Sequence, residues 1–371
     1  MDSVKQIRFI SVIAIWMLTS PVWGQNKIVT RTPPSKKTVI EADGPFSEGL
    51  ARVGKSSNLG FAYGFIDLTG KVVIPCKWKS PESFSEGLAL VEERTEFSGK
   101  RGFIDRTGKL VIPLEWTNAS SFQEGLARVM NDNGMEGFID KTGKLVIPCQ
   151  WAGVSSFHDG LALVGGYYKD GYEDKDGYID KTGKLVIPVD WSNARPYSEG
   201  KSFSEGLAAV QGRGKWGFID TTGTLVIPCQ FKDADSFNEG LACVITDDNK
   251  AGYIDKNGKM VITLDEQWVL TIYSSFSDGL AVVYNKELKK YGYINKSGIL
   301  VIPFGWNDAR PFSEGLAHVS NYDKTNTGFI DKTGRLVIPI TKPAGSFSEG
   351  FAMIEGLGYI DKTGKVVIKP H

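Results

Sequence analysis

The sequence is poor in the residues that most enzymes use for acid–base, nucleophilic or metal chemistry. Only three of 371 residues are histidines, His158, His318 and His371, and only four are cysteines. The chain has no Gly-x-Ser-x-Gly elbow, no His-Glu-x-x-His motif, no phosphate loop and no dinucleotide fingerprint. We therefore expect a protein that is not an enzyme, without a cofactor or a metal site.

An excess of charge of either sign is also missing. The 43 basic residues balance the 43 acidic residues, so the formal net charge is zero. Nucleic acids and anionic membranes attract proteins with a basic excess. We do not expect either of them to be the principal partner.

The first 24 residues differ in character from the rest. Lys5 and Arg8 precede an apolar run over residues 9–18, and Pro21 and Gly24 follow it. This is the layout of a secretory signal peptide, and the run is shorter than the roughly 20 apolar residues that span a bilayer. We predict that residues 1–24 are removed, that the protein is exported to the periplasm, cell surface or medium, and that residues 25–45 form a tether and cap strand.

The cysteines do not indicate a disulfide framework. Cys76, Cys149 and Cys229 each follow Val-Ile-Pro, at a place where other copies of this segment carry an apolar residue. Cys243 lies fourteen residues after Cys229, and a bond between these two stays open because spacing does not reveal geometry.

Two short signatures alternate along the chain and divide it into nine units over residues 46–371, with a mean period of about 38 residues. The first signature is aromatic-x-acidic-Gly, which usually continues as Gly-Leu-Ala-x-Val; it begins at Phe46, Phe84, Phe122, Phe157, Tyr197, Phe237, Phe276, Phe312 and Phe347. The second is Gly-aromatic-Ile-Asp/Asn; it begins at Gly64, Gly102, Gly137, Gly177, Gly217, Gly252, Gly292, Gly328 and Gly358.

The spacing between signatures separates a fixed part of the unit from a variable part. From the acidic or amide end of the second signature to the next aromatic, the distance is 17 residues in six of eight cases. From the aromatic to the next Gly-aromatic-Ile, it varies from 11 to 20 residues. The variable segment is therefore predicted to be a surface loop, and insertions of this kind gather on one face of a repeat protein.

The fixed part reads as a β-hairpin, as in residues 102–113. Two β-branched and aromatic runs are joined by Asp-x-Thr-Gly, in which Asp105 can accept hydrogen bonds from the turn and Gly108 can adopt positive φ. Pro113 has no N–H for the ladder and ends the second strand. Leu-Ala-x-Val supplies a third strand.

Three short strands cannot bury a core alone, so each unit must pack on its neighbours. We predict an all-β array of nine three-stranded antiparallel units in an open, solenoid-like stack. A closed β-propeller is the alternative, less favoured because nine units exceed the usual four to eight blades.

Two groups of aromatic residues are candidate binding sites. Tryptophans at one register of the repeat could stack on sugar rings, although tryptophan at constant phase also suits core packing; they are Trp78, Trp116, Trp151, Trp191 and Trp306. The longest variable segment places Tyr167, Tyr168 and Tyr172 among glycines, a composition suited to adaptable contacts.

The repeated acidic residues have a structural interpretation. The acidic residue of the first signature recurs nine times, whereas one active site needs one set, so we expect it to hydrogen-bond in a turn or ladder. The turn aspartates could suggest calcium sites, but a basic residue usually follows and Asn295 replaces Asp once.

The repeat resembles the WG-repeat (KWG-type) proteins of bacteria, and Lys215-Trp216-Gly217 carries the tripeptide that names them. The resemblance covers residues 46–368, although the other eight copies replace the Trp before Gly. It implies a β-rich interaction module without an activity or ligand common to the family. We expect a scaffold for protein–protein interaction, with polysaccharide or cell-wall binding as the alternative.

Overall fold

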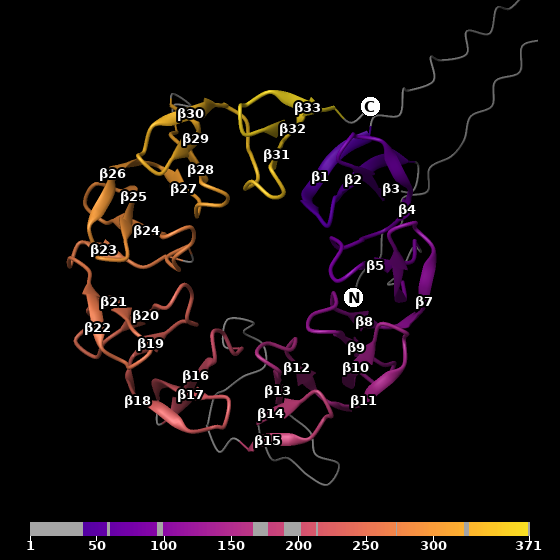
Figure 1. Ribbon diagram of the computed structural model, residues 1–371, viewed down its shortest axis with the longest axis horizontal. Coiled ribbons are helices and arrows are strands. Elements are labelled where there is room, and N and C mark those ends of the chain that lie inside the picture. Colours follow the sequence, from indigo (N-terminus) through magenta and orange to yellow (C-terminus); the bar gives the residue numbers. More distant parts are fainter. Residues whose placement is uncertain are drawn as a thin grey trace, which may run out of the picture. The chain divides into compact units, whose positions relative to one another are not determined.

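The computed structural model describes residues 40–57, 60–94, 99–165, 177–188, 202–212, 214–271, 273–322 and 326–369. All its regular elements in these ranges are β-strands, and they form nine small antiparallel sheets. Figure 1 shows the sheets arranged as nine blades of a propeller, with β31 closer to the centre of the ring than β33. No helix in the described ranges is long and apolar enough to cross a membrane.

The strands follow one another in sequence within each blade. The first four blades comprise β1 (Ile40–Ser47), β2 (Leu50–Ser57), β3 (Gly60–Asp67) and β4 (Val72–Trp78); β5 (Leu88–Glu92), β6 (Arg101–Asp105) and β7 (Leu110–Trp116); β8 (Asn118–Ala119), β9 (Leu126–Met130), β10 (Glu136–Asp140) and β11 (Leu145–Trp151); and β12 (Gly153–Val154), β13 (Leu161–Gly165), β14 (Gly177–Asp180) and β15 (Leu185–Pro188).

Blades 5 to 9 repeat the arrangement. They comprise β16 (Leu207–Gly212), β17 (Lys215–Asp220) and β18 (Leu225–Phe231); β19 (Asp233–Ala234), β20 (Ala242–Ile245), β21 (Ala251–Ile254) and β22 (Met260–Thr263); β23 (Trp268–Val269), β24 (Leu280–Asn285), β25 (Lys290–Asn295) and β26 (Leu300–Trp306); β27 (Asp308–Ala309), β28 (Leu316–Ser320), β29 (Gly328–Asp331) and β30 (Leu336–Pro339); and β31 (Phe351–Ile354), β32 (Gly358–Asp361) and β33 (Val366–Ile368).

The prediction of three strands per unit is incomplete. Six of the sheets formed by the described residues contain a fourth strand at the start of the blade. In five of these six it is only two residues long, as in β8, which explains why periodicity in the sequence did not reveal it. Of the residues predicted to form a tether and cap strand, 40–45 belong to β1, which pairs with β2 as a strand of the first blade; residues 25–39 lie outside the described ranges, so that part stays a prediction.

Two turn types build every blade. In Asp-x-Thr-Gly, the Gly108 N–H donates to the Asp105 carbonyl and the Asp105 N–H donates to the Lys109 carbonyl, each at 2.9 Å, as in a type I turn with a G1 bulge. The positive φ predicted for Gly108 is confirmed at +81°. In the first signature, Glu86 and Gly87 have φ +53° and +89° between the paired residues Ser85 and Leu88. Positive φ at both central residues defines a type I′ hairpin turn.

One aromatic pair joins each blade to the next. The aromatic of Gly-aromatic-Ile packs against the aromatic that opens the following turn, with ring centroids 4.7 to 5.0 Å apart and tilted or edge-on geometry. Each pair lies in one of the nine hydrophobic clusters, most of which combine residues of two adjacent blades. The core is therefore a chain of interfaces between blades.

The same contacts close the ring between blades 9 and 1. Tyr359 packs on Phe46 at 4.8 Å, and the Ser348 hydroxyl donates to the Phe46 carbonyl at 2.8 Å. The equivalent hydroxyl of Ser85 donates to Phe122 at 2.7 Å inside the array. The predicted open stack is therefore wrong and the propeller alternative holds, because the last blade presents to the first the same surface that each blade presents to its successor (Figure 1).

Candidate functional site

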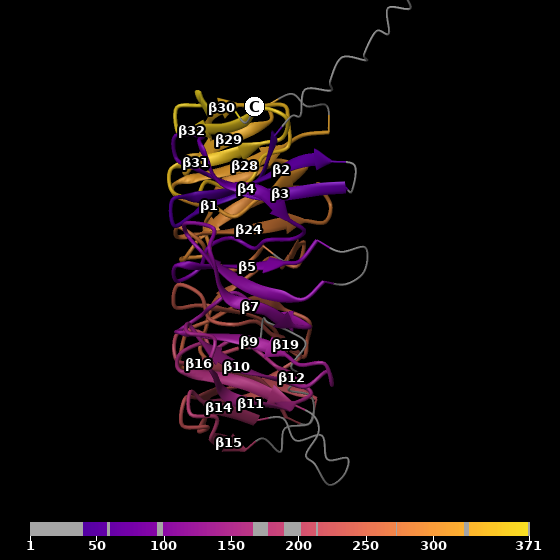
Figure 2. The ribbon, with the colours of Figure 1, turned by 90° about the vertical axis from the view of Figure 1, so that its right-hand side faces the viewer.

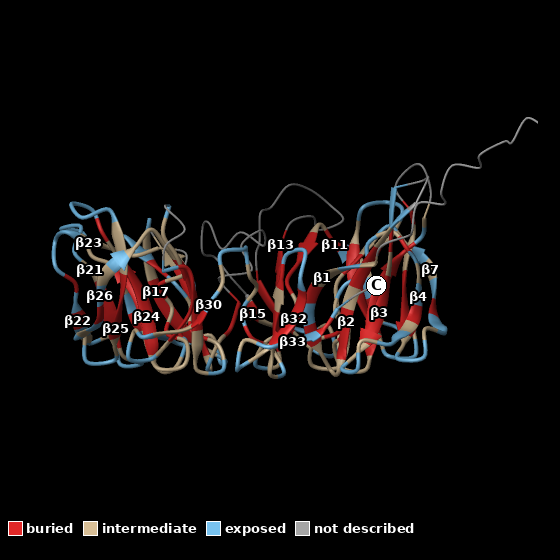
Figure 3. Ribbon diagram, turned by 90° about the horizontal axis from the view of Figure 1, so that it is seen from above, coloured by how far each residue is buried: buried red, intermediate tan, exposed pale blue. Residues whose placement is uncertain are grey.

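The propeller has two chemically different faces. Because neighbouring strands are antiparallel, the x-acidic-Gly turns and the Asp-x-x-Gly turns lie at one face, which we call the turn face. The variable connections between the Leu-Ala strand and the Gly-aromatic-Ile strand, and the links between blades, lie at the other, the loop face. In Figure 2 the end of β2 and the start of β3 extend toward the loop face, and Figure 3 shows the buried strands between the two faces.

The acidic residues of the turn face form a closed set of contacts. Each carboxylate accepts a hydrogen bond from the turn glycine N–H of the next blade, at 2.6 to 3.0 Å, and Glu349 does so with Gly49 across the closure. Five of these carboxylates also pair with a lysine of that blade, as Glu86 does with Lys141 at 2.9 Å. The predicted hydrogen-bonding role holds, and the partner is the neighbouring blade.

The turn aspartates are used within their own turns. The Asp105 carboxylate accepts from the Thr107 hydroxyl at 2.6 Å, the Thr107 N–H at 2.9 Å and the Lys109 N–H at 3.1 Å. The Thr107 hydroxyl bond, with the two backbone N–H groups, holds the pKa of Asp105 below its ordinary value against the opposing effect of desolvation. The described residues contain no cluster of three or more side chains that could hold a metal ion.

A polar groove of about 800 Å³ crosses the first segments of blades 2, 3 and 4. These segments lie on the inner side of the ring, where Figure 1 shows β8 closer to the centre than β11. Arg101 enters the groove from β6 and bonds Asn118 Oδ1 at 2.6 Å and the Ala119 carbonyl at 3.4 Å. The Ser121 hydroxyl donates to Glu82 at 2.6 Å. The groove thus offers both charges and several hydroxyl and amide groups.

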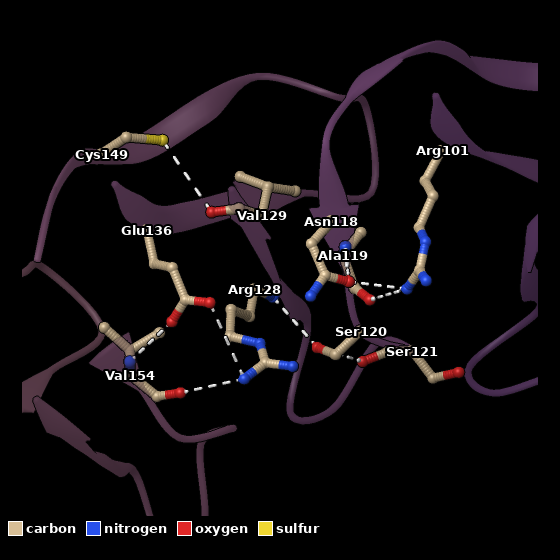
Figure 4. Close-up of polar contacts among 10 residues, drawn as sticks. All are labelled: Arg101, Asn118, Ala119, Ser120, Ser121, Arg128, Val129, Glu136, Cys149 and Val154. Atoms are coloured by element: carbon tan, nitrogen blue, oxygen red, sulfur yellow. Dashed lines mark hydrogen bonds and ion pairs between the residues drawn. The ribbon is translucent and has the colours of Figure 1, made fainter. Parts of the chain in front are cut away.

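A second arginine of this groove is tied to the next blade (Figure 4). Arg128 donates to the Val154 carbonyl at 3.3 Å and lies 3.9 Å from the Glu136 carboxylate, which accepts the Val154 N–H at 2.7 Å. Burial raises the pKa of Glu136, against the opposing effects of Arg128 and the Val154 N–H. Arg52 has the same place in blade 1 and donates to the Pro81 carbonyl at 2.8 Å. Both arginines are therefore held in position by backbone acceptors.

The groove residues were not predicted from the sequence. Arg128 occupies the variable position of Leu-Ala-x-Val, and Arg101 and Glu136 occupy the position before Gly that gives the repeat its name. The available signal was a charged residue at a register where other copies carry apolar residues such as Leu90 and Leu163.

The tryptophan register lies mainly in the interfaces between blades. Trp78 and Trp151 are 7% and 5% exposed within hydrophobic clusters, and Trp116 and Trp306 are half-buried against such clusters. An indole buried in this way has no free face for a sugar ring, so Trp78 and Trp151 are packing residues and the predicted sugar ladder is not formed by them. Trp191 lies outside the described residues.

The predicted tyrosine site also lies outside the described residues. Tyr167, Tyr168 and Tyr172 follow the end of β13 at Gly165, and β14 begins at Gly177. The site therefore stays a prediction.

All four cysteines are free thiols, so the open question of a Cys229–Cys243 bond is answered in the negative. Cys243 is buried, with its thiol 3.5 Å from the Ser274 carbonyl, and burial raises its pKa to about 12. Cys229 is a half-buried residue of β18. Both act as apolar fillers.

Comparison with protein families identifies the repeat. The model of the WG containing repeat matches residues 63–94, 102–134, 137–165, 177–216, 216–249, 252–288, 291–324, 328–355 and 358–371. The chain belongs to the WG-repeat family. Each matched segment except the last, which covers β32 and β33 of blade 9, joins the outer strands of one blade to the inner strands of the next, so the sequence repeat is out of phase with the blade. A comparison with curated proteins finds no match.

Solved structures with similar folds include three of different kinds. BamB from Moraxella catarrhalis aligns with TM-score 0.41 and 14% identity, over 76% of this chain and 88% of that chain. Apo AztD from Citrobacter koseri gives 0.38 and 14%, over 80% and 91%. A eukaryotic initiation factor gives 0.49 and 13%, over 79% and 85%. Similarity at this level carries no information on the ligand of this WG-repeat protein.

Proposed function

We propose that this WG-repeat protein is an exported, non-catalytic scaffold that binds a protein partner through its loop face and the adjoining groove. The observation that supports this proposal is the contrast between the turn face and the loop face. The turn face repeats one set of contacts nine times and satisfies its carboxylates internally, whereas the loop face differs from blade to blade in length, charge and shape. A partner can be distinguished only by a surface on which the blades differ.

The chemistry of the groove favours a protein as the partner. Arg101 and Arg128 line the groove together with Glu82 and Glu86, so its charge is balanced, which suits a mixed polar surface better than a polyanion. Arginines held by backbone acceptors are already ordered before a partner arrives, which lowers the entropic cost of association.

The experiment is capture of partners from an envelope extract with three forms of the protein. Wild type is compared with Arg101→Ala/Arg128→Leu in the groove and with Lys141→Ala/Lys362→Ala on the turn face. We expect one protein partner to be retained by wild type and by the turn-face control and to be lost by the groove variant. The proposal would be contradicted if the groove variant kept the partner while the turn-face control lost it. It would also be contradicted if the protein bound a glycan array and captured no protein partner.

The tyrosine segment and the signal peptide each extend the proposal. Replacing Tyr167, Tyr168 and Tyr172 by serine should weaken capture of the same partner. If capture is unaffected by the serine variant, the tyrosine segment is not part of the binding surface.

The signal peptide is tested by N-terminal sequencing of the protein recovered from fractionated cells. The sequence should begin at Gln25 in an exported fraction, and an intact Met1 in the cytoplasm would contradict export.

A further inference from the structure

A separate pocket of about 360 Å³ opens between blades 8 and 9, on the loop face. Its walls come from Asp308 and Arg310 at the start of blade 8, from His318 in β28, and from Lys342 in the connection that leads into blade 9. This volume is within the range of pockets that bind small molecules. None of these residues belongs to the groove described above.

His318 is a polar side chain buried in the wall of this pocket. It is 7% exposed, and its Nε2 has no hydrogen-bond partner among the described residues. Phe329 packs edge-on against the ring at 5.4 Å and fixes its orientation. Buried polar atoms in proteins nearly always have a partner, so the unpaired Nε2 of a side chain that lines the pocket marks His318 as a candidate contact for a ligand. Blades 2 and 4 place Leu90 and Leu163 at the same register.

Arg310 adds a positive charge to the wall of this pocket. Its guanidinium carbon lies 5.8 Å from the centroid of the Tyr273 ring, within the range of a cation–π contact. The described residues give this guanidinium no hydrogen bond or ion pair, although the Arg310 backbone is held by bonds to His318 and Tyr293. Edge N–H groups of arginine match a carboxylate in a bidentate arrangement.

The charge of the pocket indicates an anion of low charge. Arg310 and Lys342 are positive and Asp308 is negative, which leaves one net positive charge because burial lowers the pKa of His318 and keeps it neutral at neutral pH. A doubly charged phosphate would face Asp308 with excess negative charge, whereas a single carboxylate balances the pocket.

We propose that the pocket between blades 8 and 9 binds a carboxylate group, held by Arg310 and Lys342 and hydrogen-bonded by His318. The carboxylate belongs either to a small organic acid or to a peptide. Both sources share the same recognition chemistry, and the test separates them.

The test is calorimetric titration of the full chain with acetate, succinate, a short peptide with a free C-terminal carboxylate, and the same peptide amidated. We expect saturable binding of at least one carboxylate and none of the amide. His318→Leu and Arg310→Ser introduce residues that other blades carry at these registers, and each should weaken binding by about tenfold or more. Arg335→Ser on the turn face of the same blade, where the arginine side chain is 78% exposed, is the matched control and should bind as wild type does.

A second readout uses the wild-type chain alone. The side-chain nitrogen resonances of the three histidines should respond selectively, with His318 shifting on addition of the bound carboxylate while His158 and His371 do not. If only the small acids bind, the peptide is excluded as the source of the carboxylate. If only the peptide binds, the small acid is excluded. No binding by any carboxylate, or equal binding by the His318 and Arg310 variants, overturns the proposal.

Discussion

The turn face and the loop face of this propeller are made from the same nine units, yet only one of them keeps the repeat. On the turn face, a carboxylate of each blade accepts the same hydrogen bond from a glycine N–H of the next blade, and Glu349 accepts it from Gly49 across the closure. Between the two faces, one register of the Leu-Ala strand holds Arg128 in one blade and His318 in another. Uniform residues therefore make the contacts that recur at every interface between blades, whereas the contacts of variable residues, such as that of Arg128 with Val154, differ from one interface to the next.

The largest expected effect comes from the aromatic interface that underlies this difference. Phe122→Ala and Phe46→Ala should each lower the free energy of unfolding by about 3–5 kcal/mol, because both rings are 1% exposed and covered by an aromatic of the preceding blade. Tyr322→Ala on the loop face should change it by about 0.5 kcal/mol or less, because that ring is 87% exposed. Urea unfolding measures all three; a much smaller effect of Phe46→Ala than of Phe122→Ala would indicate an unclosed ring.

Glycines with positive φ on the two faces provide the next contrast. Gly108 of the turn face has φ +81°, and a Cβ there would lie 3.0 Å from Ile74 Cγ2 of the preceding blade. Gly134 of the loop face has φ +74° and open space around it. Gly134→Ala should cost about 1–2 kcal/mol from backbone strain alone, and Gly108→Ala should cost more. Equal shifts in the urea midpoint would show that the turn is not packed against its neighbour.

Acid should weaken the turn face before the loop face. Asp105 and its equivalents have folded-state pKa values below the unfolded value of 3.8, so their stabilisation is complete above about pH 4 and is lost as the pH falls through the folded pKa. Asp105→Asn should cost about 1 kcal/mol or less at pH 7, because Asn295 builds the same turn in blade 7. Its urea midpoint should fall less between pH 7 and pH 3 than that of wild type, and an unchanged pH slope would contradict this account.

The smallest expected effect is a gain. Leu68, 45% exposed, occupies the register at which five other blades pair a lysine with the preceding carboxylate. Leu68→Lys should add an ion pair with Glu349 and stabilise the ring by about 0.2–1 kcal/mol at low salt, with the gain reduced at high salt. Thermal unfolding at two ionic strengths measures it, with Leu68→Gln as the uncharged control.

The elements that depend on neighbours in sequence could be predicted. The Asp-x-Thr-Gly turn and the loop of variable length follow from local chemistry, and the structure has them where the spacing indicated. The prediction that Pro113 ends the second strand is wrong, because β7 continues through Pro113 to Trp116, which pairs with Arg101. The closure could not be predicted, because it depends on the angle between blades and on contacts such as Tyr359 with Phe46, which are more than 300 residues apart. The expectation of an open stack was based on the number of units, and this number does not determine the angle between blades.

The candidate sites were less accessible from the sequence. The repeated tryptophans drew attention because they recur, and recurrence reflects packing between blades. Arg101, Arg128 and His318 occupy positions where the copies disagree, so no pattern singled them out. Their common feature is a polar residue at a register that other blades fill with apolar side chains, and this departure from the repeat is the more informative signal.

The central claim, a ring closed by an interface equivalent to the others, is tested most directly by spin labels on either side of the closure. Labels at Leu68→Cys and Val367→Cys, in a chain whose native cysteines are replaced by the apolar residues of other copies, should show the same strong dipolar broadening as a matched pair at Arg106 and Val73 of blades 2 and 1. Broadening in the matched pair but none across the closure would contradict the account.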